Sequence, residues 1–205
     1  MNNPWEEIDL TAYEKHMGLD SVYQLQALNR MMKNQFYSYP VQSIMVLGVA
    51  GGNGLEHIDK QVIKKVYGVD INKGYLETCI NRYPELRGVL YTICADLTQE
   101  TSELPYADLV VANLVVEYIG YENFQRVVKQ ISPNYVSAII QINVDTAFVS
   151  DSPYLHVFDR LDEVHHQMEE IALVNAMRQV GYRKLTQIDQ DLPNGKKLVR
   201  IDFTN

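Results

Sequence analysis

Cysteine is scarce in this sequence. Its two cysteines, Cys79 and Cys94, belong to no Cys-x-x-Cys or Cys/His cluster. Disulfide frameworks and structural zinc sites require such spacings, so the sequence predicts neither. The histidines show no ligand spacing beyond the adjacent pair His165 and His166, and we expect no metal site. Two unpaired thiols are typical of a reducing compartment, and the cytoplasm is the expected location.

Long hydrophobic runs are also missing. No apolar segment approaches the roughly 20 residues that a membrane-spanning helix needs. Glu6, Glu7 and Asp9 follow close behind Trp5, where a secretory signal has basic and then apolar residues. The sequence therefore predicts neither a membrane segment nor a signal peptide. Its 205 residues, 46% of them hydrophobic, suffice for one sizeable globular core.

Basic residues are outnumbered by acidic ones, and the formal net charge is −8. The densest basic runs are the pairs Lys64-Lys65 and Lys196-Lys197. A protein that binds nucleic acid normally presents a basic face to the phosphates, so we expect no nucleic-acid partner. An acidic surface repels polyanions, which favours a small uncharged or cationic ligand.

The most informative feature that is present is a glycine-rich turn after an apolar run. Ile44–Leu47 has the composition of a buried strand, and Gly48, Gly51, Gly52 and Gly54 follow at once. Glycine allows positive φ and lets a ligand approach the backbone. In a parallel α/β sheet such a turn binds a nucleotide-like cofactor at the carboxyl end of the first strand. A tight turn without a ligand is the alternative.

A second short strand supports the cofactor interpretation. Val66–Val69 is apolar and ends in Asp70. A carboxylate at this place accepts hydrogen bonds from both hydroxyls of a ribose. The alternative role for Asp70 is to cap the helix that we expect to begin near Lys73.

The same turn argues against a nicotinamide cofactor. A Gly-x-Gly-x-x-Gly fingerprint needs its third glycine for close packing of helix on strand. Counted from Gly52, the three positions are Gly52, Gly54 and His57, so the last glycine is missing. An NAD-type oxidoreductase is therefore a disfavoured alternative.

These motifs resemble those of the class I S-adenosylmethionine-dependent methyltransferases. In that family the first strand runs into an acidic-x-Gly-x-Gly-x-Gly loop, and here Ala50, Gly52 and Gly54 stand at the three glycine positions. Asp70 matches the ribose-binding acid of the family. The resemblance implies S-adenosyl-L-methionine as the cofactor.

Two later segments extend the resemblance. Cys94–Leu97 is similar to the adenine-contacting turn, and Ala107–Asn113 resembles the fourth strand, whose end reaches the reaction centre. The cofactor site that the resemblance implies consists of Gly48, Val49, Ala50, Gly51, Gly52, Gly54, Asp70, Ile71, Asp96, Leu97 and Asn113.

The sequence departs from the family pattern at Gly48, which stands where the family carries an acid that helps hold the methionine end of the cofactor. The resemblance thus implies one charged partner fewer, and a cofactor-binding protein that does not catalyse is the alternative function. Gly48→Asp is expected to tighten binding only if Gly48 does not need positive φ. The family's base- and glutamine-amino methyltransferases carry an Asn/Asp-Pro-Pro-aromatic sequence, which is absent at Asn113-Leu114-Val115-Val116.

Strands and helices alternate along most of the chain, which predicts an α/β fold with a mostly parallel, Rossmann-like sheet. Residues 1–40 are predicted to form a helical cap across the carboxyl edge of the sheet, and residues 41–205 the cofactor-binding domain. In the cap we expect helices at Leu10–Met17 and from Ser21 to Pro40. The domain is predicted to contain, in order, strand Ile44–Leu47, helix Asn53–Lys60, strand Lys65–Val69, helix Lys73–Arg82, strand Val89–Ile93, strand Asp108–Ala112, a helix through Asn123–Gln130 and strand Tyr135–Asn143.

The end of the chain breaks this alternation. Tyr182–Asp189 and Lys196–Phe203 have strand-like sequences and are joined through Asn194-Gly195, a strong hairpin signal. A C-terminal hairpin that brings one antiparallel strand into the sheet also agrees with the methyltransferase resemblance.

A long connection precedes the hairpin. Leu161–Gln179 predicts a helix that His165 and His166 open, and Thr146–Arg160 predicts a long loop at the carboxyl edge. Such loops are more often lids or binding loops than idle chain, so we expect this one to cover a substrate pocket together with the N-terminal helices. The side chains expected around that pocket are Tyr13, His16, Tyr37, Tyr118, Tyr121, Tyr154 and His156.

Four residues are candidates for catalysis. We expect Asn113 and Tyr118 at the reaction centre, and His165 or His166 as a general base with a pKa near neutrality. The alternative for Asn113 is a strand-end residue that satisfies nearby backbone groups. The alternative for His165 and His166 is a solvated pair on an exposed helix face. The predicted function is S-adenosylmethionine-dependent methyl transfer to a small-molecule acceptor. The sequence specifies neither that acceptor nor the oligomeric state.

Overall fold

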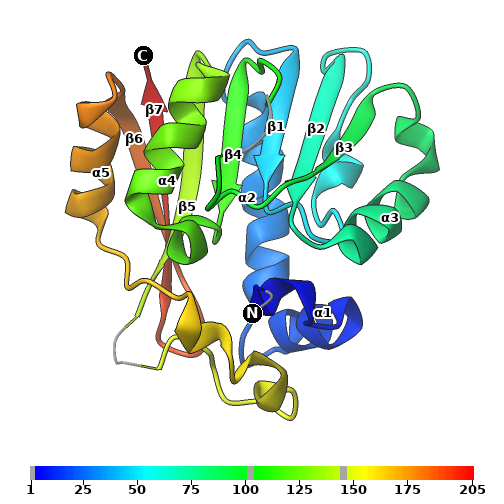
Figure 1. Ribbon diagram of the computed structural model, residues 1–205, viewed down its shortest axis with the longest axis vertical. Coiled ribbons are helices and arrows are strands. Elements are labelled where there is room, and N and C mark those ends of the chain that lie inside the picture. Colours follow the sequence, from blue (N-terminus) through cyan, green and yellow to red (C-terminus); the bar gives the residue numbers. More distant parts are fainter. Residues whose placement is uncertain (1–2, 101–103, 144–146) are drawn as a thin grey trace.

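The computed structural model describes residues 3–100, 104–143 and 147–205, and its centre is a seven-stranded sheet (Figure 1). The strand order is β3-β2-β1-β4-β5-β7-β6. Strands β1 to β5 pair in parallel, and β7 runs antiparallel to both β5 and β6. The predicted mostly parallel sheet with a C-terminal hairpin is therefore confirmed. The strands are β1 Ser43–Leu47, β2 Lys65–Asp70, β3 Leu90–Cys94, β4 Leu109–Asn113, β5 Tyr135–Ile142, β6 Arg183–Asp191 and β7 Lys197–Thr204.

Helices cover the sheet and its carboxyl edge. Among the described residues, no helix is both long and apolar enough to cross a bilayer. The α-helices are α1 Leu10–Gly18, α2 Gln24–Tyr37, α3 Lys73–Arg82, α4 Val116–Ile131 and α5 Glu170–Gln179. Short 3-10 turns are η1 Pro4–Glu6, η2 Leu55–His57, η3 Pro84–Leu86, η4 Leu155–Phe158 and η5 Leu161–Glu163.

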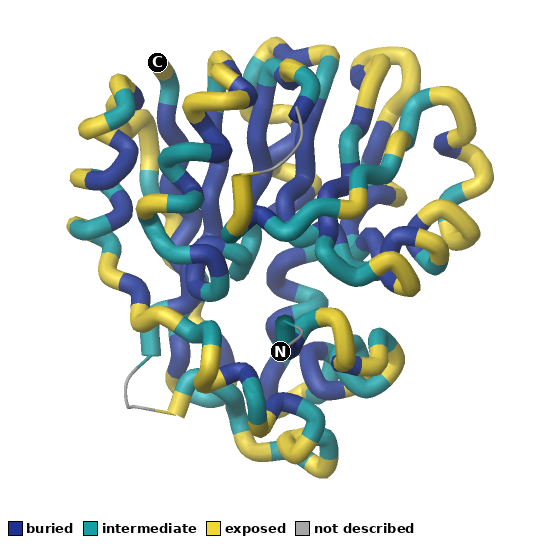
Figure 2. The backbone as a smooth tube through the Cα atoms, viewed as in Figure 1, coloured by how far each residue is buried: buried dark blue, intermediate teal, exposed yellow. Residues whose placement is uncertain are grey.

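The core has one layer on each face of the sheet, and β4 shows how the sequence builds both. Successive side chains of a strand point to opposite faces. Val110 and Ala112 pack with α4 and α5, whereas Leu109 and Val111 pack with α2 and α3. Figure 2 shows the central strands buried between helices whose outer sides are exposed. Burial on both faces explains why these strands are apolar without interruption.

The sequence predicted a helix at Asn53–Lys60, but this segment instead packs against helix α2. After the glycine turn the chain forms only the short turn η2, so that helix prediction is wrong. Asn29 of α2 hydrogen-bonds to Asn53 Oδ1 and to His57 Nε2. A Cβ on Gly54 would lie 2.9 Å from Met32 Sδ, also on α2. Contacts with α2 thus hold this segment in place of a helix of its own.

The N-terminal helices occupy two places. η1 and α1 lie at the carboxyl edge of the sheet, at the lower end of the molecule in Figure 1. α2 instead packs on a face of the sheet, where Met32 and Phe36 join the core formed with β1 and β4. It begins after Tyr23, whose φ is +59°, and not at Ser21 as predicted. The structure therefore makes α2 part of the main core.

The helix predicted at Leu161–Gln179 begins nine residues later, at Glu170. The chain before it is tied to α4 instead, because the His166 N–H donates to Glu117 O at 2.6 Å. His165 and His166 therefore precede α5 in an irregular segment, and the prediction that they open the helix is wrong.

Candidate active site

A hollow opens at the carboxyl edge, beside the point where the strand order reverses between β1 and β4. Ligands of open α/β sheets bind in this crevice. The hollow, called here the first hollow, encloses about 650 Å³ of empty space, part of it open to solvent. Its wall contains seven of the eleven residues of the cofactor site that the resemblance implies. These seven are Gly48, Ala50, Asp70, Ile71, Asp96, Leu97 and Asn113.

The other four residues of that predicted site lie outside the wall. Val49 is buried in the core. A Cβ built on Gly51, Gly52 or Gly54 would lie less than 3 Å from a side chain of α1, α2, α3 or the residue after α3. The missing Cβ at these three positions lets the helices close on the turn. Their role in cofactor binding stays a prediction.

Gly48 has a backbone that disfavours a side chain. Its φ is +67°, and a Cβ there would lie 3.2 Å from Val115 Cβ. Residues with a Cβ enter this left-handed region at a cost of roughly 1–2 kcal/mol. Gly48 therefore needs positive φ, and the condition under which an aspartate at this position would tighten cofactor binding is not met.

Asp70, the last residue of β2, links the glycine turn to the chain after β2 in the wall of the first hollow. Its Oδ2 accepts the Ala50 N–H and its Oδ1 accepts the Asn72 N–H, each at 2.9 Å. Burial raises the pKa of this carboxyl, and the same backbone hydrogen bonds oppose that shift. The N-cap of α3 is Asn72, which accepts from the Tyr75 N–H, so the alternative role of Asp70 as that cap is excluded.

Asp96 and Asn113 both have local partners at the wall. Asp96 Oδ1 accepts from the backbone N–H and the hydroxyl of Thr98, at 2.9 and 2.7 Å. The Asn113 amide exchanges two hydrogen bonds with the amide of Gln35 on α2, at 2.9 and 3.0 Å. These two hydrogen bonds fix the orientation of the Asn113 amide at the end of β4. Asp96 thus closes a local turn, whereas Asn113 bonds to a side chain of α2 and not to nearby backbone groups. The roles of both residues in cofactor binding stay predictions.

The first hollow fits the cofactor that the resemblance implies. Each Asp70 carboxylate oxygen retains a lone pair for a hydroxyl donor. Ile71 and Leu97 supply apolar surface for a base, and the missing Cβ of Gly48 leaves the backbone open to the hollow.

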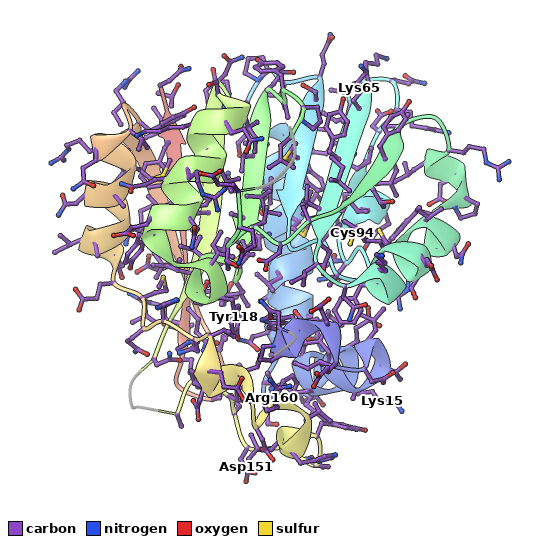
Figure 3. The ribbon with its side chains drawn as sticks, in the orientation of Figure 1. Lys15, Lys65, Cys94, Tyr118, Asp151 and Arg160 are labelled. Atoms are coloured by element: carbon purple, nitrogen blue, oxygen red, sulfur yellow. The ribbon has the colours of Figure 1, made fainter. Side chains whose placement is uncertain are left out.

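A second hollow adjoins the first and shares Trp5, Tyr13, Leu114 and Tyr118 with it. It encloses about 510 Å³, again partly open to solvent. The Trp5 ring meets Tyr13 and Tyr118 edge-on, with centroids 5.6 and 4.8 Å away. Tyr118 lies at the lower, carboxyl edge in Figure 3, opposite Lys65 at the start of β2. The remaining wall consists of His16, Met17, Gln24, Glu117, Gln141, Phe148, Val149, Phe158, Leu161 and His165.

The segments predicted to cover a substrate pocket meet over the second hollow. His16 Nδ1 of α1 lies 2.7 Å from Ser152 Oγ, and Arg160 forms an ion pair with Glu7 at 2.6 Å. These contacts join the N-terminal helices to the late segment. His156 is exposed and lines neither hollow. Thr146, where the predicted loop begins, lies outside the described residues.

Tyr118 and His165, two of the catalytic candidates, have pKa values shifted in opposite directions. Burial, with the nearby charges of Glu117 and Tyr13, raises the pKa of Tyr118 well above its usual value, so Tyr118 is a hydrogen-bond donor. Burial and the charge of His166 lower the pKa of His165 to about 4, so its ring is neutral at pH 7. His165 stacks on Phe148 at 3.7 Å. His166 is exposed and lines neither hollow.

Glu117 is a polar wall residue that the sequence did not single out. The residue is 3% exposed, and burial raises its pKa to about 7 against the effect of the Gln141 N–H, which donates to Oε1 at 2.8 Å. Its Oε2 is buried with no hydrogen-bond partner among the described residues, as is Trp5 Nε1. The available signal was an acid set between apolar Val116 and Ile119.

The described residues contain neither a metal-binding cluster nor a disulfide. Among residues 3–100, 104–143 and 147–205, no group of three or more His, Cys, Asp or Glu side chains could hold a metal ion. Cys79 is buried, Cys94 is exposed, and both thiols are free.

Comparison with known proteins points to one family. Residues 45–133 match a family model described as a methyltransferase domain. That match spans β1 to the end of α4 and so includes most of the wall of the first hollow. No curated protein sequence matches the chain significantly.

Solved structures share the fold at low sequence identity. The N-methyltransferase NodS from Bradyrhizobium japonicum is 12% identical with a TM-score of 0.66, and the match covers all of this chain and 99% of that one. A Leishmania major S-adenosylmethionine-dependent methyltransferase is 17% identical (TM-score 0.67), with 97% and 80% covered. The magnesium protoporphyrin IX methyltransferase of Synechocystis is 11% identical (TM-score 0.61), with 94% and 83% covered. The match to the family model, together with the glycine turn, identifies residues 45–133 as a class I S-adenosylmethionine-dependent methyltransferase domain, and the solved structures share the fold of the chain around it.

Proposed function

We propose that this methyltransferase acts on a small, neutral or cationic acceptor that occupies the second hollow while the first holds S-adenosylmethionine. The observation that carries the proposal is the shared wall of Trp5, Tyr13, Leu114 and Tyr118, because it sets the two ligands side by side. When bound, the cofactor supplies an electrophilic methyl group on its sulfonium sulfur. The net charge of −8 disfavours polyanionic acceptors, nucleic acids included. Two free thiols suit a cytoplasmic location.

The proposal assigns a role to each part of the first hollow. Asp70 accepts the ribose hydroxyls, Ile71, Asp96 and Leu97 border the adenine, and the backbone of the Gly48 turn faces the methionine end. Support comes from the place of these residues on one wall and from the free lone pairs of Asp70.

Neighbouring structures support a small acceptor. One is named as an N-methyltransferase and another for magnesium protoporphyrin IX. In this chain, the aromatic side chains around the second hollow exclude water from the reacting atoms and hold an acceptor in one orientation. The wall groups able to take up a proton are His16 and His165, whose pKa values burial lowers, and Glu117, whose pKa burial raises to about 7.

Calorimetry with S-adenosylhomocysteine tests the cofactor site. Asp70→Ala is expected to weaken binding about five- to hundredfold, because hydrogen bonds worth roughly 1–3 kcal/mol are lost. Asp59→Ala, which removes an exposed aspartate from another loop, serves as the control and should change nothing. An unchanged dissociation constant in Asp70→Ala refutes the ribose assignment.

Transfer of a labelled methyl group to a panel of amines, phenols and carboxylic acids tests the acceptor class. Small acceptors should be labelled and oligonucleotides should not. Binding of S-adenosylhomocysteine without transfer to any acceptor would instead support a cofactor-binding protein that does not catalyse.

A further inference from the structure

The second hollow holds an acid, Glu117, whose charge no described side chain balances with an ion pair. Glu117 lies at the start of α4, nearly fully buried, with Oε1 engaged by the Gln141 N–H. Its Oε2 has no partner among the described residues. A buried carboxylate without a partner is costly, so such a group either stays protonated or meets a complementary charge from a ligand.

Among the residues that the structure describes, no side chain supplies that charge to Glu117. The titratable groups of the same wall are Tyr13 and His16 on α1, Tyr118 on α4 and His165 before α5. Lys196, before β7, donates to Asn143 Oδ1 and to the Ala147 carbonyl, and its charge acts on His16 and His165. None of these residues hydrogen-bonds to Glu117 in the described structure, so Oε2 keeps its hydrogen-bonding capacity unused in the wall of the hollow.

Aromatic rings make up much of the remaining wall. Trp5, Tyr118 and Phe148 line the hollow, and the Trp5 and Tyr118 rings are in edge-to-face contact. Ring faces attract cations, and tryptophan does so most strongly. A desolvated carboxylate framed by aromatic rings is the arrangement that recognises an ammonium group.

We infer that the second hollow binds an amine acceptor as its ammonium ion, with Glu117 as the acceptor-binding residue that also takes up the amine proton. The inference rests on the proposed function, because the amine must lie beside the cofactor. An ammonium nitrogen has no lone pair, so one N–H proton first passes to Glu117 Oε2. The nitrogen then bonds to the methyl carbon while the carbon–sulfur bond breaks and leaves its electron pair on sulfur. The positive charge of the sulfonium ends on the methylated nitrogen, and the proton leaves Glu117 for solvent.

The pKa of Glu117 agrees with this role. Burial raises it to about 7, so the carboxyl gains and loses a proton within the physiological range. A cation binds only to the ionised form, so affinity for an ammonium ligand should increase as pH rises from 6 to 8.

Three probes of similar size test the inference on the full chain saturated with S-adenosylhomocysteine. Benzylamine, benzyl alcohol and benzoate are titrated by calorimetry at pH 8. Benzylamine should bind about tenfold or more tightly than benzyl alcohol, because a charge-assisted hydrogen bond replaces a neutral one. Benzoate should not bind.

Variants assign the preference to one carboxyl. Glu117→Gln retains an oxygen for the Gln141 N–H and should remove both the preference for benzylamine and its dependence on pH, without changing affinity for S-adenosylhomocysteine. Glu122→Gln, the same change at an exposed position of α4, should leave both intact. If Glu117→Gln does not fold, the pH series on the wild-type protein decides.

Opposite results separate the two proposals. The inference is overturned if benzyl alcohol or benzoate binds as well as benzylamine, if benzylamine fails to bind at millimolar concentration, or if its affinity is flat between pH 6 and 8. None of these three outcomes contradicts the proposed function, provided that S-adenosylhomocysteine binds. Failure of S-adenosylhomocysteine itself to bind removes the proposed function and the inference together.

Discussion

A single backbone angle accounts for the glycine at residue 48, where the resemblance implies an acid. Gly48 has a φ of +67°, and the side chain of Val115 lies over it. The Gly48 N–H donates to Val69 O, which fixes the turn to β2. A larger residue at this position meets both a backbone cost and a steric cost. The turn is therefore shaped around glycine. In the proposed placement of the cofactor, its methionine end must find its partners elsewhere.

Gly48→Ala should destabilise the fold by about 1–2 kcal/mol or more, because alanine is strained at positive φ. Gly88→Ala is the matched control, since Gly88 has a φ of +82° but no atom within 4 Å of a built Cβ. The difference between the two variants isolates the crowding against Val115. Urea unfolding measures both free energies. An equal decrease in the free energy of unfolding in the two variants would show that the Val115 side chain moves aside without an energetic cost.

Sequence reasoning found the residues whose type is tied to a local pattern. Asp70 was placed at the hollow because parallel strands end at one edge of a sheet, so an acid at the end of the second strand lies beside the turn that follows the first. Glu117 was not, because its sequence context is an ordinary helix start and its significance comes from burial by Gln141 and the aromatic wall. Burial of a polar residue is decided by distant segments, which no local pattern reports.

Elements were predictable where one local signal dominated. The strands β1, β2, β4 and β5 follow from apolar runs, and the final hairpin from Asn194-Gly195. The helix expected at Asn53–Lys60 failed, because hydrogen bonds from Asn29 and packing of Met32 on Gly54 outweigh the weak helical preference of so short a segment. A tertiary contact, the hydrogen bond from the His166 N–H to Glu117 O, likewise holds the chain before α5 out of the helix, so α5 begins at Glu170 and not at Leu161.

Two truncations distinguish the roles of the N-terminal elements. Removal of residues 1–20 takes away η1 and α1, and with them Trp5, Tyr13 and His16 from the hollows. We expect the truncated protein to fold, because α1 is attached to the rest of the molecule by surface contacts such as the Glu14–Arg82 ion pair. We expect weakened cofactor binding and no methyl transfer, because both hollows lose wall residues.

Removal of residues 1–38 should instead unfold the chain. It deletes Met32 and Phe36 from the core, and loss of one buried aromatic side chain alone costs about 3–5 kcal/mol. Far-ultraviolet circular dichroism and thermal unfolding compare the two truncations. A sharp unfolding transition in the longer truncation would mean that α2 is a separable cap, as the sequence alone suggested.

At the scale of the whole molecule, buried groups whose pKa values are shifted make the stability depend on pH, and Glu117 is one of them. The pKa of Glu117 is about 7 in the folded protein against a usual value of 4.5. The unfolded chain therefore binds fewer protons than the folded one between these values, and the free energy of unfolding falls as pH rises through this window. His165 acts in the opposite direction, because its lowered folded pKa favours the native state above its usual pKa of 6.5 and costs stability as pH falls toward 4. The two effects overlap in mildly acidic solution, so the wild-type curve alone does not separate them.

The difference between Glu117→Gln and the wild-type protein does separate them, because every other group cancels. Glutamine does not titrate, so the variant should gain stability relative to the wild type as pH rises from 4.5 to about 7, and the difference should level off above that. A shift of 2.5 pKa units at 1.36 kcal/mol per unit sets the rise at about 3 kcal/mol. Urea unfolding at pH 5, 6, 7 and 8 measures the difference, and Glu122→Gln should give a flat line. A difference that stays constant across this range would show that Glu117 is ionised at pH 5 and already has a partner for its charge.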